Sequence, residues 1–414
     1  MRLLAVGDMH LGRLPTSLPE ALAGDARALG PEVAWRRCVE HARRIGAEAV
    51  LMAGDVVDRE RDFFAGYDQL RAGVEQLLAA GIRVLAVAGN HDTHVLPRLA
   101  DAVDGLELLG RGGRWETAEL SAGSVVGWSF PQRRVTRSPL ADWAAPRGRR
   151  PHIGLLHCDR DQRDSVYAPV TSAELAHAGL DAWLLGHVHR PDLAGDERPT
   201  GYLGSVSALR ASETGCRGPW AIDIGDGPVR AVQVALAPLA YERLVIDAVD
   251  VERVDALDAA LLAGAQRIAA ERARADALPD ALGLRVRVAG EHADGLALRE
   301  TATALAAERT VFEQSGCRMF FDRIDCDIAP PLDLEALARQ PDPAGLLARD
   351  LLLLAGPDSE RRRRLVDEAR ERMDVAGAIG ELHAVGAPID DEQAADALWR
   401  AGRLALARLM AQRS

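Results

Sequence analysis

Five short apolar segments constrain this chain of 414 residues most, because acidic, amide or imidazole side chains follow each of them directly. With their polar ends the segments span residues 4–13, 50–58, 84–92, 153–159 and 183–189. Short apolar runs bounded by Gly or polar residues are typical of strands buried on both faces of a sheet. Ligands collect beyond the carboxyl ends of such strands, so we predict that the five polar ends converge on one site.

The predicted site contains two carboxylates, one amide oxygen and four imidazoles, supplied by Asp8, His10, Asp55, Asn90, His157, His187 and His189. Asp8 and His10 are two positions apart, as are His187 and His189, so on an extended chain the two members of each pair would point to one side. One divalent ion cannot use all these donors, whereas two ions that share a carboxylate can. Mixed nitrogen and oxygen donors without a cysteine cluster predict Mn²⁺, with Fe or Zn as alternatives.

In chain order the residues form the motifs D-x-H, GDxxD, GNHD, a single His and GHxH, and this set resembles the calcineurin-like metallophosphoesterase superfamily. Within it, the sequences at 8–12 and 89–92 resemble the SbcD-type DNA repair exonucleases. Segments 167–169, 180–187 and 213–215 are similar to the YhaO-type branch of that group. The resemblance is strong up to about residue 240 and holds only in outline beyond it.

The resemblance implies a phosphodiester hydrolase whose two divalent ions share Asp55. It implies that Asp8, His10 and His189 hold one ion, and that Asn90, His157 and His187 hold the other. Ion pairs of this kind activate water and neutralise charge on the phosphate. It also implies two catalytic residues outside the ligand set: His91 as general acid or oxyanion stabiliser, and Asp58 as the residue that orients His91.

The order of predicted elements indicates an α/β fold. Strands and helices alternate up to residue 92, which predicts right-handed parallel crossovers. Beyond Trp115 the segments are shorter, and an Asp226-Gly227 turn signal indicates a second, largely antiparallel sheet. Together with the resemblance, this predicts a four-layer α/β/β/α metallophosphoesterase sandwich over 1–238. A small βαβαβ capping domain over 239–330 and a helical C-terminal tail over 331–414 would follow it.

Charge gives mixed indications about partners. The net charge of −12 is unlike that of most nucleic-acid-binding domains, although local charge matters more than the total. The most basic stretch is 131–151, which contains Trp143 and six arginines: Arg133, Arg134, Arg137, Arg147, Arg149 and Arg150. The sequence leaves two interpretations of this stretch equally open, a DNA-binding surface and a solvated charged loop.

Other features bear on the compartment. No run approaches the ~20 apolar residues that cross a bilayer, and Met1 leads directly into a predicted strand. We therefore expect no membrane span and a cytoplasmic location. The five cysteines are scattered and odd in number, which favours reduced thiols over a disulfide framework.

Three functions remain open at this point. The preferred one is a DNA exonuclease or endonuclease, acting in DNA repair with an SbcC/YhaN-like ATPase of the SMC/Rad50 type that the C-terminal helices would dock. Homodimerisation is compatible with it. The first alternative is a phosphodiesterase or phosphatase for a small substrate, although Asp92 stands where protein phosphatases of the superfamily have Glu. The second is a non-catalytic ATPase adaptor, which would have no need of an intact His91.

Overall fold

The computed structural model describes residues 1–58, 63–162, 164–195, 197–225, 227–329, 331–377 and 390–411. The chain divides into two compact units. One consists of Met1–Leu244, Leu262–Val286 and Leu305–Ile324, and the other of Val245–Leu261, Arg287–Ala304 and Asp325–Ser414. We describe each unit by itself.

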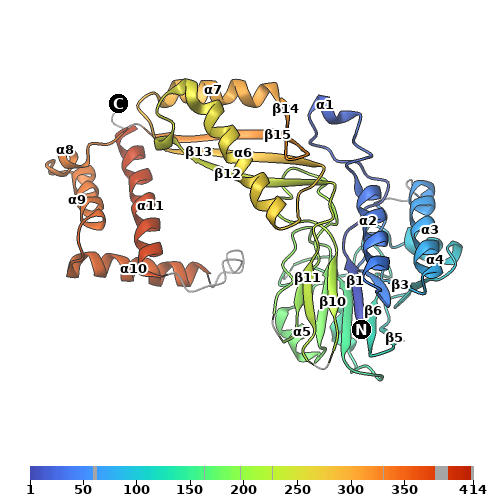
Figure 1. Ribbon diagram of the computed structural model, residues 1–414. Helices are drawn as coiled ribbons and strands as arrows, with labels where there is room; N and C mark the ends of the chain where they lie inside the picture. The colour runs from blue at the N-terminus through green and yellow to red at the C-terminus, as the bar shows by residue number, and fades with distance from the viewer. Residues whose placement is uncertain are drawn as a thin grey trace. The chain divides into compact units, whose positions relative to one another are not determined.

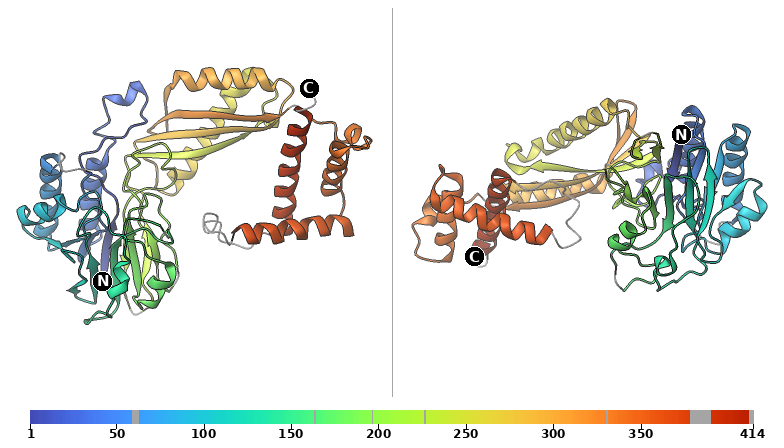
Figure 2. Two further views of the ribbon diagram at one scale, coloured as in Figure 1. Left: turned by 180° about the vertical axis from the view of Figure 1, so that it is seen from behind. Right: turned by 90° about the horizontal axis from the view of Figure 1, so that it is seen from below.

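The first unit contains a six-stranded sheet in the order β11-β10-β1-β2-β3-β4. Its strands are β1 (Arg2–Val6), β2 (Ala49–Met52), β3 (Arg83–Ala86), β4 (Leu106–Leu108), β10 (Trp220–Asp223) and β11 (Arg230–Gln233). β1 to β4 are parallel. Three helices that follow or precede these strands cover one face of the sheet: α2 (Pro31–Arg44), α3 (Phe63–Ala79) and α4 (Val95–Ala102) (Figures 1 and 2). The short helix α1 (Glu20–Ala23) precedes α2.

The second sheet has the order β5-β6-β7-β8-β9. Its strands are β5 (Glu116–Leu120), β6 (Gly123–Trp128), β7 (His152–His157), β8 (Ala182–Gly186) and β9 (Thr200–Tyr202). β5 and β6 are antiparallel, but β6, β7, β8 and β9 run parallel, so the prediction of a largely antiparallel sheet is wrong. The connections cross over the sheet, and one of them contains α5 (Ser172–His177). β7 and β8 are buried throughout, as parallel strands covered on both faces are.

The predicted hairpin near residue 226 exists, but it extends the first sheet. β10 pairs with β11 and, on its other side, with β1, antiparallel in both cases. Asp226, which we expected in the turn, lies outside the described residues. The sequence identified the turn but did not indicate which sheet the hairpin joins, because pairing partners distant in sequence leave no local signal.

Successive residues of the central strands point to opposite faces of the sheet and so belong to different apolar cores. Val50 and Met52 of β2 belong to the core beneath α2 and α3. Leu51 belongs to the core between the two sheets. A third core, which includes Trp183, packs the outer face of the second sheet against α5. The α/β/β/α sandwich is therefore confirmed, and its alternation follows from the two-residue period of a strand.

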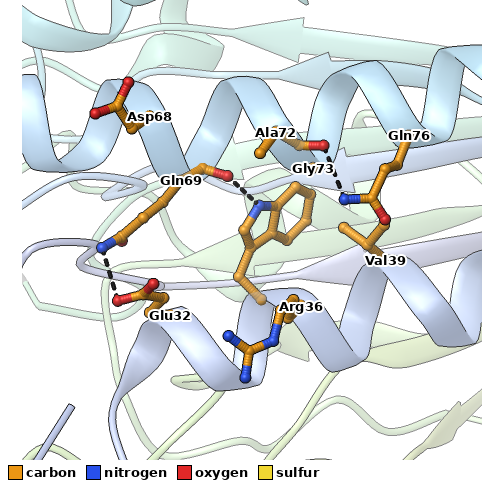
Figure 3. A pocket seen from close by; sticks show the side chains of 9 residues that line it. Glu32, Arg36, Val39, Asp68, Gln69, Ala72, Gly73 and Gln76 are labelled. Carbon is orange, nitrogen blue, oxygen red and sulfur yellow. Dashed lines mark hydrogen bonds between the residues drawn. The ribbon is translucent and has the colours of Figure 1, made fainter. Parts of the chain in front are cut away.

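α2 and α3 approach each other closely, with Glu32 of α2 beside Gln69 of α3 (Figure 3). The indole nitrogen of Trp35 donates to the backbone carbonyl of Gln69, at 3.1 Å. A Cβ added to Gly73 would lie 2.3 Å from the same indole nitrogen, so the helix requires glycine here. Residues around the indole, including Glu32 and Gln76, line a small cavity of about 210 Å³.

The sheet predicted for the capping region is present with an additional strand. It consists of β12 (Leu239–Asp247), β13 (Ala281–Glu291), β14 (Val311–Gln314) and β15 (Cys317–Ala329), in the order β12-β13-β15-β14, with the helices α6 (Leu257–Arg274) and α7 (Gly295–Glu308) between strands. The observed order is thus βαβαββ, because Ser315 and Gly316 form a tight turn with φ of 54° and 81° that joins β14 to β15.

Four helices complete the second unit: α8 (Leu334–Ala338), α9 (Pro343–Ala355), α10 (Glu360–Gly377) and α11 (Asp391–Ala411). The predicted helical C-terminal region is confirmed. Asp342 caps α9 by accepting a hydrogen bond from Gly345 N at 2.7 Å. The predicted domain limits at 238 and 330 remain predictions, and residue 330 itself is not described. None of the helices that the structure describes has the length and apolar character needed to cross a membrane.

Candidate metal centre

The structure brings all the predicted metal ligands together at the carboxyl ends of five strands, three from the first sheet and two from the second. Their acidic and imidazole atoms fall into overlapping groups within 4.8 Å: Asp8, His10 and His189; His10, Asp55 and His91; and Asp55, His157 and His187. The amide oxygen of Asn90 lies 2.9 Å from His157 Nε2 and 3.0 Å from His187 Nδ1. The convergence predicted from the sequence is therefore present in the fold.

Several of these residues have a left-handed backbone conformation, which directs their side chains, and do not lie on extended chain. The φ angles are 42° at Asp8, 47° at His10, 48° at Asp55 and 105° at His187. β1 ends at Val6, so the expectation that Asp8 and His10 share one side of an extended strand is wrong. Non-glycine residues adopt such angles only when the surrounding structure enforces them, which is common at functional sites.

The Nδ1 atoms of His10 and His157 each lie close to an oxygen outside the ligand set. His157 Nδ1 lies 2.9 Å from the carbonyl oxygen of Ala53, and His10 Nδ1 lies 3.0 Å from a carboxylate oxygen of Asp58. An acceptor at one nitrogen holds the ring proton there. Nε2 of both rings is thereby left as a lone pair directed into the site.

His187 and His189 repeat this arrangement with carboxylates. His187 Nε2 lies 3.1 Å from Asp159 Oδ1, and His189 Nδ1 lies 2.9 Å from Glu213 Oε1. Burial lowers the pKa of both histidines, but these hydrogen bonds and the nearby carboxylates outweigh burial and raise it above the ordinary value. The site is thus strongly attractive to positive charge, whether a proton or a metal ion.

The inward-facing atoms test whether metal ions fit this site. His10 Nε2 lies 3.0 Å from His189 Nε2, and His157 Nε2 lies 3.2 Å from His187 Nδ1. With the outer nitrogens protonated, these are lone pairs facing lone pairs, next to the Asn90 oxygen and two buried carboxylates. The carboxylates accept backbone N–H bonds from His91 and His187, but the facing ring nitrogens would still oppose lone pair to lone pair, an arrangement that a cation satisfies. Imidazole with carboxylate oxygen suits Mn, Fe or Zn. The residues therefore fit the two predicted ions.

Two aspartates near the centre have opposite pKa shifts. Burial raises the pKa of Asp55, but His157 and His10 outweigh burial and the net pKa is lowered. Burial and the neighbouring Asp55 carboxylate raise the pKa of Asp92 to about 8. Asp92 accepts hydrogen bonds of 2.7 Å from the backbone nitrogens of Gly89 and Val56. Its position beneath the turn indicates that Asp92 braces the GNHD segment.

His91 lies beside the centre, as predicted for a catalytic residue. Its backbone nitrogen donates to Asp55 Oδ1 at 2.9 Å, and its Nδ1 lies 3.2 Å from the carbonyl oxygen of Asp58. Asp58 thus contacts His91 through its backbone carbonyl oxygen, and the predicted role of Asp58 in orienting His91 stays a prediction. The Asp58 carboxylate lies 3.0 Å from His10 Nδ1 and 3.3 Å from Arg13 Nη1.

Comparison with known proteins identifies the domain. Residues 1–191 match the family of calcineurin-like phosphoesterases. This part of the chain is a calcineurin-like phosphoesterase domain. The chain is 24% identical over 239 residues to the uncharacterized metallophosphoesterase YhaO of Bacillus subtilis, covering 54% of this chain and 56% of YhaO.

A second relative is the DNA double-strand break repair protein Mre11 of Aeropyrum pernix, 28% identical over 249 residues, with 55% of this chain and 59% of Mre11 covered. The chain thus spans a little over half the length of these relatives. Among solved structures, purple acid phosphatase PPD1 from yellow lupin aligns with a TM-score of 0.38 and 14% identity, covering 56% of this chain and 51% of that one. The assignment does not rest on this weak similarity.

Sequence reasoning missed two acidic residues that contact histidines of the site. Asp159 stands two residues beyond His157 in the same polar strand end, which was an available signal. Glu213 belongs to segment 213–215, which we noted only for its similarity to the YhaO-type branch, and its pairing with His189 could be identified only in three dimensions. Both residues orient metal-ligand candidates, a role that supporting carboxylates commonly have in metal sites.

The phosphoesterase domain also explains one glycine of its motifs. A Cβ on Gly89 would lie 2.3 Å from Asp55 Oδ1 and 2.8 Å from His157 Cε1. Any larger residue would therefore displace two ligand candidates that belong to different sheets. This close approach accounts for the glycine of GNHD in this chain.

Proposed function

We propose that this chain is a metal-dependent DNA exonuclease or endonuclease that hydrolyses phosphodiester bonds. The observation that carries the proposal is the convergence of imidazole lone pairs and buried carboxylates beside His91. DNA as the substrate is supported by the motifs shared with SbcD-type nucleases and by the described role of the relative Mre11 in DNA double-strand break repair.

In this proposal Asp55 is shared between two divalent ions, Mn²⁺ by preference. One ion would be held with Asp8, His10 and His189, and the other with Asn90, His157 and His187. Ions bound in this way supply an activated water nucleophile and neutralise charge that develops on the phosphate. Asp159 and Glu213 hold two of the histidines in the tautomer that such binding requires.

The remaining chemistry belongs to His91. Hydrolysis forms one P–O bond from water and breaks the ester P–O bond, and the leaving oxygen needs a proton. Because His91 Nδ1 is bound to the Asp58 carbonyl, Nε2 is the nitrogen available to deliver that proton from the imidazolium. Asp58 acts as a positioning residue, through its carbonyl at His91 and its carboxylate at His10.

The wider assignment rests on family resemblance. We propose a role in DNA repair with an SMC/Rad50-like ATPase docked on the C-terminal helices, a cytoplasmic location, and domains at 1–238, 239–330 and 331–414. Homodimerisation is compatible with these assignments.

A phosphodiesterase or phosphatase for a small substrate is the second candidate. The observation that favours it is the net charge of −12, since a short anionic substrate needs no extended basic surface. It would use the same centre and the same His91. A non-catalytic adaptor is less well supported, because it would not need His91 beside the centre.

The experiment that separates these candidates compares hydrolysis of single-stranded DNA, duplex DNA, cyclic nucleotides and bis-p-nitrophenyl phosphate with Mn²⁺. Cleavage of DNA but not of cyclic nucleotides is expected. His91→Asn should abolish cleavage and retain bound metal, whereas Asp55→Asn should lose both. His177→Asn, at an exposed position on α5, is the matched control. Undiminished turnover in His91→Asn would remove the general-acid assignment.

A further inference from the structure

The arginine-rich segment 131–151 begins directly beside the metal centre. Phe130 immediately precedes it, and its ring centroid lies 5.7 Å from that of His157. Val135 then pairs with Tyr167 through hydrogen bonds of 2.8 Å, from Val135 N to Val166 O and from Ala168 N to Val135 O. Residues 130–135 are therefore fixed at both ends against the site region.

Tyr167 extends this connection to a second ligand candidate. Its ring centroid lies 5.0 Å from that of His187, and the side chain is partly exposed. One end of the segment thus contacts His157 and the other reaches His187 through Tyr167. A strand of substrate that leaves the centre on this side would meet residues 131–135 first.

Arg133 and Arg134 lie between these two anchors. Both are exposed, and neither guanidinium has a hydrogen bond or ion pair with the residues that the structure describes. Other arginines of the segment are engaged: Arg137 binds Asp142 at 2.8 Å, and Arg150 donates to the Gly179 carbonyl at 2.7 Å. Two unneutralised guanidinium groups beside a phosphoesterase centre suit the phosphates that flank a cleaved bond.

A cavity of about 560 Å³ continues this surface. Val135 lines it, together with Trp115, Trp128 and Arg114 and with the Arg137–Asp142 ion pair. Aromatic faces combined with arginine are the usual means of holding bases of a single strand. Val135 is common to the cavity and to the pairing with Tyr167, so the cavity adjoins the segment that borders the centre.

We infer that residues 130–137 form the track for the DNA strand that is cleaved. Arg133 and Arg134 bind the phosphates next to the scissile one, and the cavity at Trp115 receives a base of the same strand. This inference rests on the proposed nuclease function and specifies a binding surface for it. It assigns the two arginines to the binding of polymeric substrate and gives them no part in bond cleavage.

The test is the salt dependence of binding to a single-stranded oligonucleotide by Arg133→Ala/Arg134→Ala. For single strands each phosphate contact contributes about 0.7 to the slope of log K against log salt, so the slope should fall by about 1.4. At 0.1 M salt the same two contacts correspond to about 25-fold weaker binding. Hydrolysis of bis-p-nitrophenyl phosphate, which has no flanking strand, should be unchanged.

The matched control removes the same charge elsewhere. Arg147→Ala/Arg230→Ala alters two exposed arginines, at the far end of the segment and on β11, and should keep the wild-type slope. Equal slopes in the two double variants would overturn the inference while leaving the nuclease proposal intact. A wild-type protein that hydrolyses bis-p-nitrophenyl phosphate but neither binds nor cleaves DNA would overturn both.

Discussion

Glu213→Gln should weaken the binding of the ion proposed to be held with His189, and leave the other ion bound. Glu213 is 8% exposed. One carboxylate oxygen accepts from His189 Nδ1 at 2.9 Å, and the other accepts from Leu209 N at 2.9 Å and from Ser205 Oγ at 3.2 Å. Glutamine has the same length, but one acceptor becomes an NH₂ donor.

Either orientation of the new amide is unfavourable. If its oxygen stays on His189, the NH₂ group faces the Leu209 N–H. If the amide is reversed, the NH₂ group faces His189 Nδ1, and the ring proton moves to Nε2, where the lone pair for the ion is needed. A hydrogen bond to a charged acceptor contributes about 1.5–3 kcal/mol. At about 1.4 kcal/mol per tenfold, this predicts roughly 10- to 100-fold weaker binding of that ion.

Calorimetric titration of the metal-free protein with Mn²⁺ measures both dissociation constants. Glu40→Gln, at an exposed position on α2, is the control for loss of one negative charge. Thermal unfolding of the metal-free variant establishes that the protein is folded. Two unchanged dissociation constants in a folded Glu213→Gln protein would refute the argument that the carboxylate holds the His189 tautomer.

Three further changes test other parts of the structure. Gly73→Ala should destabilise the fold by about 1–3 kcal/mol, because the added Cβ would meet the Trp35 indole. Gly24→Ala is the control, since Gly24 has open space around it and the fold should keep its stability. Thermal unfolding measures both variants. Burial and then Arg150 lower the pKa of His152, so the folded state binds fewer protons than the unfolded state, and stability is lost as pH falls below the ordinary histidine pKa of about 6.5. His152→Gln should flatten that decline in urea unfolding. Asp159→Asn should weaken the binding of the ion proposed to be held with His187 and leave the ion held with His189 bound. The same calorimetric titration measures both dissociation constants.

The sequence predicted which residues gather at the centre, because their chemistry is unusual at the ends of apolar strands. His187 and Asn90 lie nearly 100 positions apart, yet each follows a short apolar run whose length and flanking glycine favour a buried strand. The type of element and the chemistry of its end were sufficient. No knowledge of strand pairing was needed.

The features that the sequence did not reveal depend on contacts distant in sequence. The direction of β7 and β8 relative to β6 follows from crossover connections, and the apolar pattern of a buried strand is the same in either direction. The left-handed angle at His10 could not be predicted, because only a small fraction of histidines adopt it and the sequence does not mark which. The pairing of Glu213 with His189 joins two loops, neither of which contains a signal for the other.

The left-handed backbone at Asp8, His10, Asp55 and His187 has a consequence for damage elsewhere in the domain. Those angles persist only while the layers of the sandwich remain tightly packed. We expect a core substitution far from the centre to let these residues relax towards ordinary angles, and to weaken the proposed metal binding while most of the domain is still folded. The amount of bound metal would then report packing defects before the domain unfolds. Excess metal would restore activity to variants that are inactive for this reason.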